Sequence, residues 1–246
     1  MSFVMRADMV LLEKGLVKSR QKAKELIEQG AVTADGVMLK KASQSLAPSA
    51  KIIIDSPLKN WVSRGALKLQ GAIARFPDLV FVDKIAIDIG ASTGGFTQVL
   101  LSKDIGHVYA LDVGHGQLAP SLVASPRVTN LEKQNARYIT QDMFSPPFDV
   151  IVTDVSFISL KLALPPALAM APKGAQLVAL IKPQFEVGRA GLDKGGIVKD
   201  AALREEVITD IRAFIADQGW HIYGVTDSPI TGPDGNHEYL LAAQKQ

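Results

Sequence analysis

The stretch that decides the fold reads Ile85-Ala86-Ile87-Asp88-Ile89-Gly90-Ala91-Ser92-Thr93-Gly94-Gly95-Phe96. Its first five residues are apolar apart from one carboxylate, which predicts a buried strand. The glycine-rich segment that follows predicts a tight turn into a helix. In open sheets that alternate strands with helices, ligands bind just beyond the carboxyl ends of the strands. The small residues of this turn therefore predict a backbone that approaches a ligand closely.

The glycine spacing narrows the choice of ligand. It is Gly-x-x-x-Gly-Gly, which differs from the Gly-x-Gly-x-x-Gly of dinucleotide sites and, lacking a following lysine, from the phosphate loop of nucleotide triphosphatases. Asp88 precedes the turn, and Asp112 ends the next predicted strand, where a carboxylate can accept hydrogen bonds from both hydroxyls of an adenosine ribose. The two acids favour S-adenosylmethionine, and a turn that merely reverses the chain is the alternative.

The same alternation continues along the chain. We expect strands over residues 84–89, 108–113, 128–132, 148–155, 175–182, 220–226 and 238–243. We expect helices over residues 65–76, 94–102, 160–170 and 201–218. Near-continuous apolar strands between helices predict a doubly wound, mostly parallel α/β sheet. The last two strands have no helix between them, which predicts an antiparallel strand inserted at the end of the sheet.

The N-terminal part differs in charge and in pattern. Residues 1–59 carry ten Lys or Arg and six Asp or Glu, a net charge of +4, whereas the remainder carries 17 and 19, a net charge of −2. Helices are expected over 6–14 and, after Ser19 as N-cap, over 20–29. Strands over 31–34 and 37–40 flank an Asp-Gly hairpin turn, and a further strand is expected over 51–55.

These elements predict a small α+β domain over residues 1–59, a linker at 60–64 within an irregular segment that starts at 56, and a second domain over 65–246. A basic appendage on an acidic body is typical of a nucleic-acid-binding module. Its cations would contact the RNA backbone, and the alternative is a solvated helix face. The cations of its two helices are Arg6, Lys14, Lys18, Arg20, Lys22 and Lys24.

Composition excludes several classes of protein. The chain of 246 residues is 47% hydrophobic and 21% charged, which excludes wholesale disorder. It has no cysteine, so disulfides, cysteine-bound metals and thiol nucleophiles are excluded. No apolar run approaches 18 residues and the N-terminus lacks a signal-like stretch, so we expect a cytoplasmic protein. Four histidines, at 107, 115, 221 and 237, show no ligand spacing, and no metal site is expected.

Four ionisable residues stand out from this pattern. Asp154 and Lys182 each follow an apolar strand, so both should emerge at the edge that carries the glycine turn. Lys68 lies in the helix before the first core strand, and Glu238 opens the last strand. A charge at the end of a buried strand is costly unless it is paired, so the four predict one charge-balanced cluster. The alternatives are a structural ion pair for Asp154 and Lys182, and plain surface charges for Lys68 and Glu238.

With these motifs in place, the chain resembles the TlyA family, often labelled hemolysin-like, which joins an S4-like RNA-binding domain to an FtsJ-like ribose methyltransferase. The S4-like likeness covers Arg6–Leu12, Ser19–Gly30 and Val32–Leu39. The methyltransferase likeness covers Trp61–Lys68, Asp88–Phe96, Asp112–Gly114, Thr153–Ser159, Lys182–Gly188 and Asn236–Leu240. The order Lys68, Asp154, Lys182, Glu238 reproduces the FtsJ-type Lys-Asp-Lys-Glu tetrad.

The resemblance implies a seven-stranded Rossmann-like methyltransferase domain that uses S-adenosylmethionine to methylate a cytidine 2′-hydroxyl of ribosomal RNA within a ribosomal subunit. The cofactor-binding residues it implies are Asp88, Gly90, Ala91, Ser92, Gly94, Gly95, Phe96, Asp112, Val113, Asn135, Ala136 and Asp154. Further RNA contacts are expected from Arg64, Phe157 and Arg189. Lys182 would act on the hydroxyl as a neutral base or as a charged hydrogen-bond donor, oriented by the other three.

Other functions are weighed against this one. A base C5-methyltransferase needs a cysteine nucleophile, and this chain has none. An exocyclic-amine methyltransferase typically carries Asp/Asn-Pro-Pro-Tyr/Phe after the fourth strand, and Asp154-Val155-Ser156-Phe157 lacks both prolines, so this function is disfavoured. A non-catalytic ribosomal-RNA-binding or assembly protein would need only the basic domain. A hemolysin fits poorly, since the sequence has no amphipathic membrane helix and no secretion signal. The glycines between residues 188 and 196 predict a mobile substrate loop.

Overall fold

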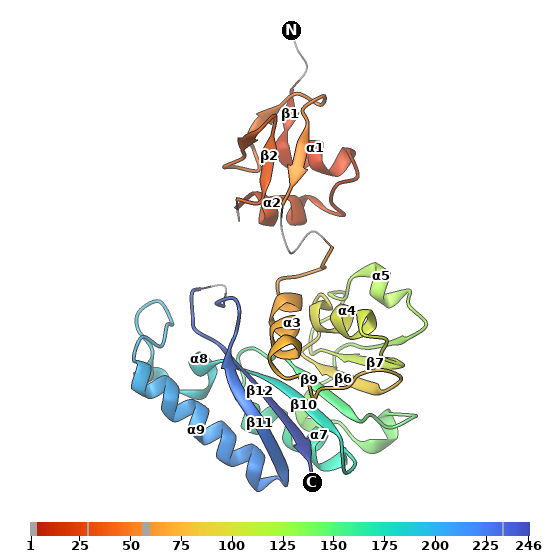
Figure 1. Ribbon diagram of the computed structural model, residues 1–246, viewed down its shortest axis with the longest axis vertical. Helices are drawn as coiled ribbons and strands as arrows, with labels where there is room; N and C mark the ends of the chain where they lie inside the picture. Colours follow the sequence, from red (N-terminus) through yellow and green to blue (C-terminus); the bar gives the residue numbers. More distant parts are fainter. Residues whose placement is uncertain (1–3, 29, 56–59, 233) are drawn as a thin grey trace. The chain divides into compact units, whose positions relative to one another are not determined.

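Residues 4–28, 30–55, 60–232 and 234–246 are described by the computed structural model, and their contacts divide the chain into two units, residues 1–61 and 62–246 (Figure 1). Residues 56–59 of the predicted irregular segment and Gln29 of the predicted second helix lie outside the described residues.

The first unit combines two helices with short strands. Helices α1 (Ala7–Glu13) and α2 (Arg20–Glu28) confirm the predicted pair, and the Ser19 hydroxyl accepts a hydrogen bond from Lys22 N at 3.1 Å, as an N-cap does. Strands β3 (Val37–Met38), β2 (Val32–Ala34) and β5 (Ile52–Ile54) form an antiparallel sheet in that order. Asp35 and Gly36 both have positive φ, 50° and 81°, as the predicted type I′ hairpin turn requires.

One strand pair of the first unit was not predicted. Strand β1 (Met5–Arg6) pairs antiparallel with β4 (Ser45–Leu46) just before α1 begins. Strands of two residues are too short for an alternating pattern to be visible in the sequence. The pairing fixes the backbone that carries Arg6, so it bears on the cations discussed below.

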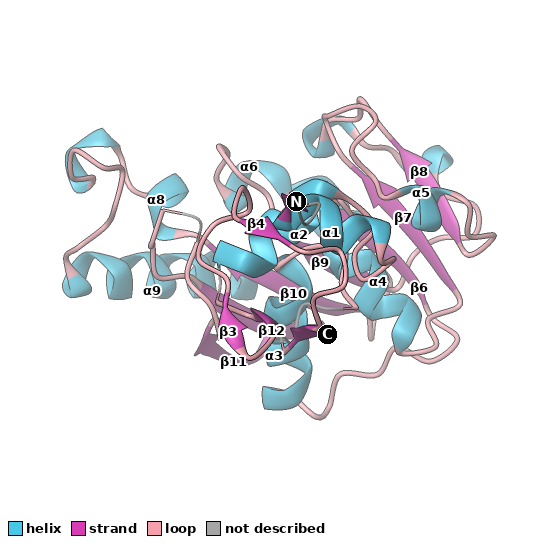
Figure 2. Cartoon of the chain, turned by 90° about the horizontal axis from the view of Figure 1, so that it is seen from above, coloured by secondary structure: helices cyan, strands magenta, loops and turns pink. Residues whose placement is uncertain are grey.

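The second unit is built on a seven-stranded sheet with the order β11-β12-β10-β9-β6-β7-β8 (Figure 2). Its parallel strands are β6 (Ile85–Ile89), β7 (His107–Leu111), β8 (Val128–Leu131), β9 (Val150–Thr153) and β10 (Gln176–Ile181). The long strand β12 (Tyr239–Lys245) is antiparallel to both β10 and β11 (Trp220–Asp227). The predicted mostly parallel sheet with one antiparallel insertion is confirmed.

Helices cover both faces of this sheet. One face packs against α3 (Gly65–Arg75), α4 (Gly95–Ser102) and α5 (Pro120–Val123). The other packs against α6 (Leu160–Ala163), α7 (Pro165–Met170) and α9 (Ala201–Asp217). Shorter turns are α8 (Pro183–Glu186) and the 3₁₀ helices η1 (Ala136–Tyr138), η2 (Gln141–Met143) and η3 (Arg189–Gly191).

The single helix predicted over 160–170 is wrong in its continuity. The chain forms α6 and α7 with a break at Leu164, because Pro165 and Pro166 have no N–H to continue the hydrogen-bond ladder of α6. Pro165 instead begins α7, a position where its missing donor costs nothing.

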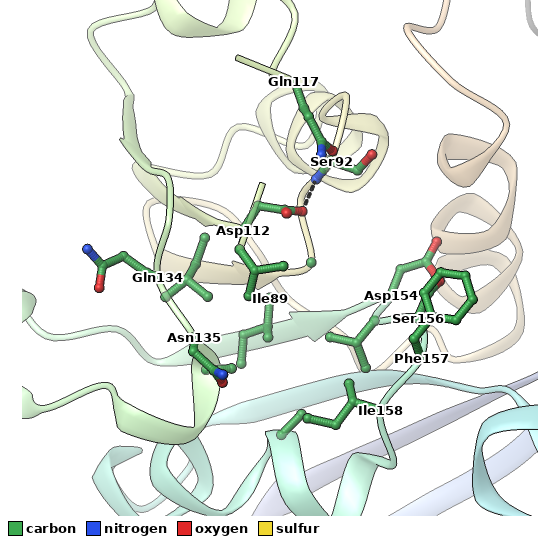
Figure 3. A pocket seen from close by; sticks show the side chains of 16 residues that line it. Ile89, Ser92, Asp112, Gln117, Gln134, Asn135, Asp154, Ser156, Phe157 and Ile158 are labelled. Carbon is green, nitrogen blue, oxygen red and sulfur yellow. Dashed lines mark hydrogen bonds between the residues drawn. The ribbon is translucent and has the colours of Figure 1, made fainter. Parts of the chain in front are cut away.

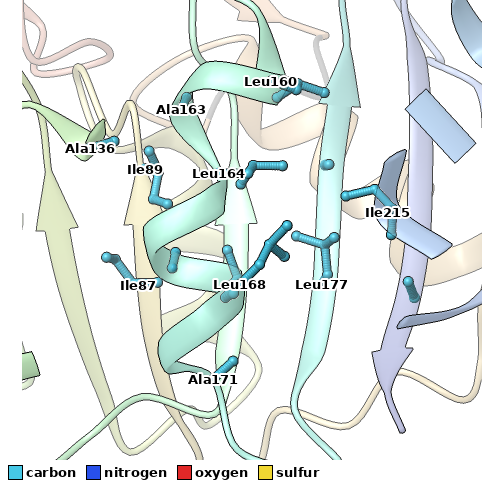
Figure 4. Close-up of a cluster of buried hydrophobic side chains, with 14 of the residues drawn as sticks. Ile87, Ile89, Ala136, Leu160, Ala163, Leu164, Leu168, Ala171, Leu177 and Ile215 are labelled. Carbon is cyan, nitrogen blue, oxygen red and sulfur yellow. The ribbon is translucent and has the colours of Figure 1, made fainter. Parts of the chain in front are cut away.

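The main core lies between the sheet and the face formed by α6, α7 and α9. Figure 4 shows Leu164 and Leu168 of the helical layer directed at the strands, with Leu177 of β10 and Ile215 of α9 beside them. All four are at most 1% exposed, and full burial of such a side chain is worth about 1.5–3 kcal/mol. Among the described residues, no helix has the length and apolar character needed to span a membrane.

The topology brings distant residues to one edge. Because β6, β7, β9 and β10 are parallel, the residues that follow them meet at their common carboxyl edge. Strand β12 runs the other way, so its first residue, Tyr239, pairs with Ile181 at the end of β10. Glu238 therefore arrives at the edge where Lys182 leaves it.

Candidate active site

The glycine turn joins β6 to α4 and requires glycine at two positions. Gly90 has a φ of 83°, and a Cβ there would lie 2.9 Å from the backbone oxygen of Asp154. Gly94 has a φ of 94°, and a Cβ there would lie 2.2 Å from a methyl carbon of Leu122. No side chain fits in either place, so these glycines let the turn pack closely against the end of β9 and against α5.

Asp88, predicted as a cofactor contact, is hydrogen-bonded to α4. It is fully buried, and its Oδ2 accepts hydrogen bonds from Thr97 N at 2.9 Å and from Thr97 Oγ1 at 2.6 Å. Burial raises the pKa of Asp88 to about 7, although the Thr97 hydrogen bonds lower it. The carboxylate is not among the residues that line the neighbouring pocket, and its hydrogen bonds go to Thr97 of α4.

A pocket of about 480 Å³ opens beyond the ends of β6, β7, β8 and β9 (Figure 3). In the figure, Asp112 and Asn135 lie on one side of Ile89, and Asp154 with Phe157 lie on the other. The lining residues come from four strand ends: Ile89, Gly90, Ser92, Leu111, Asp112, Val113, Gln117, Gln134, Asn135, Ala136, Asp154, Val155, Ser156, Phe157, Ile158 and Ala163. The pocket thus combines apolar walls with a few polar groups, as small-molecule sites do.

Asp112 is held in place by the backbone around it. Its Oδ1 accepts a hydrogen bond from Gly114 N at 2.7 Å, and its Oδ2 accepts one from Ser92 N at 2.8 Å. A carboxylate oxygen can accept more than one hydrogen bond. Asp112 is therefore fixed in orientation while both oxygens keep a lone pair for a ligand.

The predicted cofactor residues divide into two groups. Those that line the pocket are Gly90, Ser92, Asp112, Val113, Asn135, Ala136 and Asp154, whereas Asp88, Ala91, Gly94, Gly95 and Phe96 do not. The second group shapes the turn and the start of α4 from behind. Sequence reasoning missed Gln117, Gln134, Val155, Ser156 and Ile158. Gln134 and Ser156 could have been predicted from the sequence, because each is next to a predicted residue in a loop that follows a parallel strand.

The four predicted charges form one connected cluster at this edge. Lys182 Nζ lies 2.5 Å from Asp154 Oδ1, and Lys68 Nζ lies 2.6 Å from Glu238 Oε2. Lys68 Nζ also lies 3.8 Å from Asp154 Oδ2, which joins the two pairs. Both lysines and Glu238 are buried, and Asp154 is partly exposed where it lines the pocket. The cluster is balanced in charge, with two ammonium groups and two carboxylates.

Ser156 adds a contact that the sequence did not single out. The Lys182 ammonium donates a hydrogen bond to Ser156 Oγ at 2.8 Å, beside its ion pair with Asp154. The ammonium is thus held by one hydrogen bond and one ion pair. The ammonium stands next to Asp154, which lines the pocket, and so it is placed to meet a group that enters from solvent.

The exposed Phe157 lines the pocket and packs against the partly buried Phe185. Phe157 is 91% exposed and has a φ of 65°, which is unusual for a bulky residue. Its ring lies 5.1 Å from that of Phe185, and the Lys182 ammonium lies 5.8 Å from the Phe185 ring. An exposed aromatic residue in an uncommon backbone conformation, at the mouth of a pocket, is typical of a functional site.

The loop predicted to be mobile is tied down at several points. Asp193 Oδ1 accepts hydrogen bonds from Gly195 N at 2.8 Å and Ile197 N at 2.9 Å. Asn236, which is buried and lies two residues before Glu238, accepts a hydrogen bond from Val198 N at 3.1 Å.

Two arginines predicted to contact RNA lie in this unit. Arg189 is exposed in η3, and Arg64 donates a hydrogen bond to Thr231 O at 3.1 Å.

The predicted cations of the first unit differ in what they face. Arg6 and Arg20 both contact Asp8, and with Lys24 they line a cleft of this unit. Lys14 and Lys18 are exposed outside that cleft. The Lys22 side chain is only 12% exposed, lies 3.6 Å from Glu25 and has its pKa lowered by burial. That burial argues against a direct RNA contact by Lys22, whereas Lys40 and Lys41, which were not predicted, line the cleft.

Comparison with known proteins first defines the class. A solved S-adenosylmethionine dependent methyltransferase from Mesorhizobium loti matches with a TM-score of 0.52 over 74% of this chain and 99% of its own. At 15% identity, the likeness concerns the fold alone. The second unit thus has the fold of the S-adenosylmethionine-dependent methyltransferases.

The chain belongs to the FtsJ-like methyltransferase family, which matches residues 61–245, and carries an S4 domain over residues 5–52. TlyA of Mycobacterium tuberculosis, a 16S/23S rRNA (cytidine-2'-O)-methyltransferase, is 43% identical over 242 residues, 98% of this chain and 90% of that protein. A solved structure from Streptococcus thermophilus that carries a hemolysin label is 38% identical, with a TM-score of 0.78 over 100% of this chain and 90% of its own. The resemblance to the TlyA family inferred from the motifs is confirmed.

Proposed function

We propose that the protein transfers a methyl group from S-adenosylmethionine to the ribose 2′-hydroxyl of a cytidine in ribosomal RNA. The observation that carries the proposal is the Lys182 ammonium, held by Asp154 and Ser156 at the edge of the pocket. The Mycobacterium tuberculosis relative is named for this reaction on 16S and 23S ribosomal RNA. The S4 domain supports an RNA substrate.

The pocket fits the cofactor in size and in chemistry. A volume of about 480 Å³ lies within the usual range for small-molecule sites, roughly 300–1,000 Å³. Asp112 offers two fixed carboxylate oxygens for the ribose hydroxyls, and Leu111, Val113 and Ile158 offer apolar surface for a base. Asp154 would lie near the sulfonium charge.

S-adenosylmethionine supplies an electrophilic methyl group when it is bound. The ribose 2′-hydroxyl is a weak nucleophile, so the protein has to orient it and to stabilise the charge that develops as its proton leaves. The Lys182 ammonium is placed to hold that oxygen, because its ion pair with Asp154 and its hydrogen bond to Ser156 fix it beside the pocket. Fixing the two reacting groups in one site removes most of the entropy cost of their encounter.

The test replaces Lys182 by methionine in the full chain, which keeps the length of the side chain and removes the ammonium. We expect S-adenosylmethionine to bind with an affinity close to that of the wild type in calorimetry. We expect methyl transfer to ribosomal RNA to fall roughly 100-fold or more, as for loss of a donor that stabilises the charge developing on the reacting oxygen. The exposed Lys103→Met serves as the matched control and should leave both measurements unchanged.

The product identifies the reaction. A 2′-O-methyl group blocks alkaline cleavage of the adjoining RNA bond, so sequencing of hydrolysed RNA locates the modified ribose. Turnover of Lys182→Met close to the wild-type rate would remove this residue from the chemistry. A wild-type chain that binds RNA and transfers no methyl group would favour the non-catalytic assembly role, and lysis of cells by the purified chain would favour the hemolysin alternative.

A further inference from the structure

The cleft of the first unit holds a buried carboxylate among its cations. Asp8 is 4% exposed in the first turn of α1, and it lines a cleft of about 500 Å³. The other charged residues of that lining are five cations and one carboxylate: Arg6, Arg20, Lys24, Lys40, Lys41 and Glu28. A buried negative charge in a surface expected to meet RNA needs a reason, because it repels phosphate.

Asp8 accepts hydrogen bonds from the Nε and Nη2 atoms of both Arg6 and Arg20. Arg6 Nε and Nη2 donate to Asp8 Oδ1 and Oδ2, both at 3.0 Å. Arg20 Nε and Nη2 donate to Asp8 Oδ2 at 3.2 and 2.9 Å. A guanidinium has five N–H donors in a planar fork, so each arginine keeps its Nη1 donors for another acceptor.

Asp8 and the two arginines differ in solvent exposure. The side chains of Arg6 and Arg20 are 50% and 52% exposed, whereas that of Asp8 is 5% exposed. The hydrogen bond from Arg6, followed by that from Arg20, lowers the pKa of Asp8 to about 2, so the carboxylate stays charged at working pH. Asp8 N also donates to Ala42 O at 3.0 Å, which anchors the segment carrying Lys40 and Lys41 beside the arginines.

We propose that Asp8 is a positioning residue for RNA binding, which holds Arg6 and Arg20 as a preorganised pair whose free edges take a backbone phosphate in this cleft. The inference rests on the proposed RNA substrate. Two long side chains that are fixed before binding lose less conformational entropy when the phosphate arrives. A guanidinium can also donate two parallel hydrogen bonds to a phosphate, whose oxygens match its planar geometry.

The proposal predicts the opposite sign from simple electrostatics. Replacing Asp8 by asparagine raises the net charge by one, which on charge alone should tighten RNA binding. If Asp8 acts by holding the arginines, the same change should weaken it. Glu28 provides the matched control, because it lines the same cleft, is exposed and pairs with Lys24 at 3.7 Å. Glu28→Gln changes the charge equally without releasing an arginine.

The experiment measures binding of full-length protein to deproteinised 16S and 23S ribosomal RNA, separately, over a range of salt concentrations. We expect Asp8→Asn to weaken binding five- to twentyfold, and Glu28→Gln to leave it unchanged or slightly tighter. We also expect the slope of log affinity against log salt to fall by about one to two for Asp8→Asn, since each lost phosphate contact removes roughly 0.7–0.9. Partial unfolding would lower the apparent affinity without changing this slope.

S-adenosylmethionine affinity and thermal unfolding are measured in parallel. Unchanged or tighter RNA binding by Asp8→Asn, with an equal or steeper salt slope, would overturn the proposal. If Asp8→Asn does not fold, Arg20→Lys answers the question, because it keeps the charge and loses the fork that Asp8 holds. A several-fold loss is then expected, and equal affinity would overturn the positioning role. Loss of methyl transfer by the wild type would count against the proposed function alone, since these readouts measure binding.

Discussion

The buried carboxylate Asp88 makes the stability of the second unit depend on pH in a way that can be measured. Burial raises its pKa from 3.8 to about 7, and the charges of Asp154 and Asp112 add to the effect. Its Oδ1 has no hydrogen-bond partner among the residues that the structure describes, so the charged form is poorly compensated. The folded protein therefore holds a proton on Asp88 more tightly than the unfolded chain does.

The sign and the size follow from the two pKa values. With a pKa raised on folding, the stabilisation from the bound proton is fully present below about pH 3.8 and is lost as the pH rises to about 7. A pKa unit corresponds to about 1.4 kcal/mol, so the total is about 4 kcal/mol, of which about 3 kcal/mol falls between pH 5 and the upper end of the window. Asparagine imitates the protonated side chain at every pH, so Asp88→Asn should not show this loss.

The assay is urea unfolding of the full chain, followed by circular dichroism and by fluorescence of the buried Trp220, at pH 5 and pH 8. We expect the free energy of unfolding of Asp88→Asn, relative to the wild type, to rise by about 3 kcal/mol between these values. Asp193→Asn is the control, since its hydrogen bond with Lys199, followed by that from Ile197 N, lowers the pKa of Asp193 to about 2, outside this window. A difference for Asp88→Asn that stays constant within about 0.5 kcal/mol would refute the reasoning.

Three further changes test the site. Ser156→Ala removes the hydroxyl that accepts from Lys182, and kcat should fall roughly tenfold in a methyl-transfer assay with little change in unfolding. Phe157→Ala should leave the free energy of unfolding within about 0.5 kcal/mol, because the ring is exposed. The same variant should raise KM for RNA roughly tenfold if the ring stacks on a base. Glu238→Gln leaves the buried Lys68 ammonium without its closest partner. Thermal unfolding should then show a loss of about 3–5 kcal/mol, and a loss under about 1 kcal/mol would contradict the pairing.

Much of the fold was predictable because its strands are apolar and its turns carry specific residues. The five parallel strands, the helices α3, α4 and α9 and the Asp35-Gly36 hairpin all follow from local patterns, whereas the four-residue helices α5 and α8 were not predicted. The misses have local causes too. Strands β1 and β4 are only two residues long. The helix expected over 160–170 is two helices, because the prolines at 165 and 166 interrupt it, and the prediction did not take these prolines into account.

The site was predictable to the extent that strand ends determine it. Asp112, Asp154 and Lys182 each follow a parallel strand, so the topology alone brings them together. Asp88 could not be assigned in this way, because the alternation of a strand decides whether a side chain faces the ligand or the helix layer. Asp8 was missed for another reason, since a carboxylate among cations looks like a local charge balance until the structure shows two arginines sharing it.

The order of charges in the cluster explains why one lysine rather than the other should meet the substrate. The chain of contacts runs Glu238, Lys68, Asp154, Lys182, so each charge neighbours its opposite. Glu238 and Lys68 are buried at one end of this chain of contacts. Lys68 Nζ lies 3.8 Å from Asp154 Oδ2, whereas Lys182 contacts the other oxygen, Oδ1. Asp154 is thereby fixed from behind while its other oxygen holds Lys182 beside Ser156. Lys68 is paired with Glu238 and with Asp154, so we expect it to orient the network. We expect the Lys182 ammonium to donate a hydrogen bond to the substrate oxygen while the proton of that hydroxyl leaves to solvent.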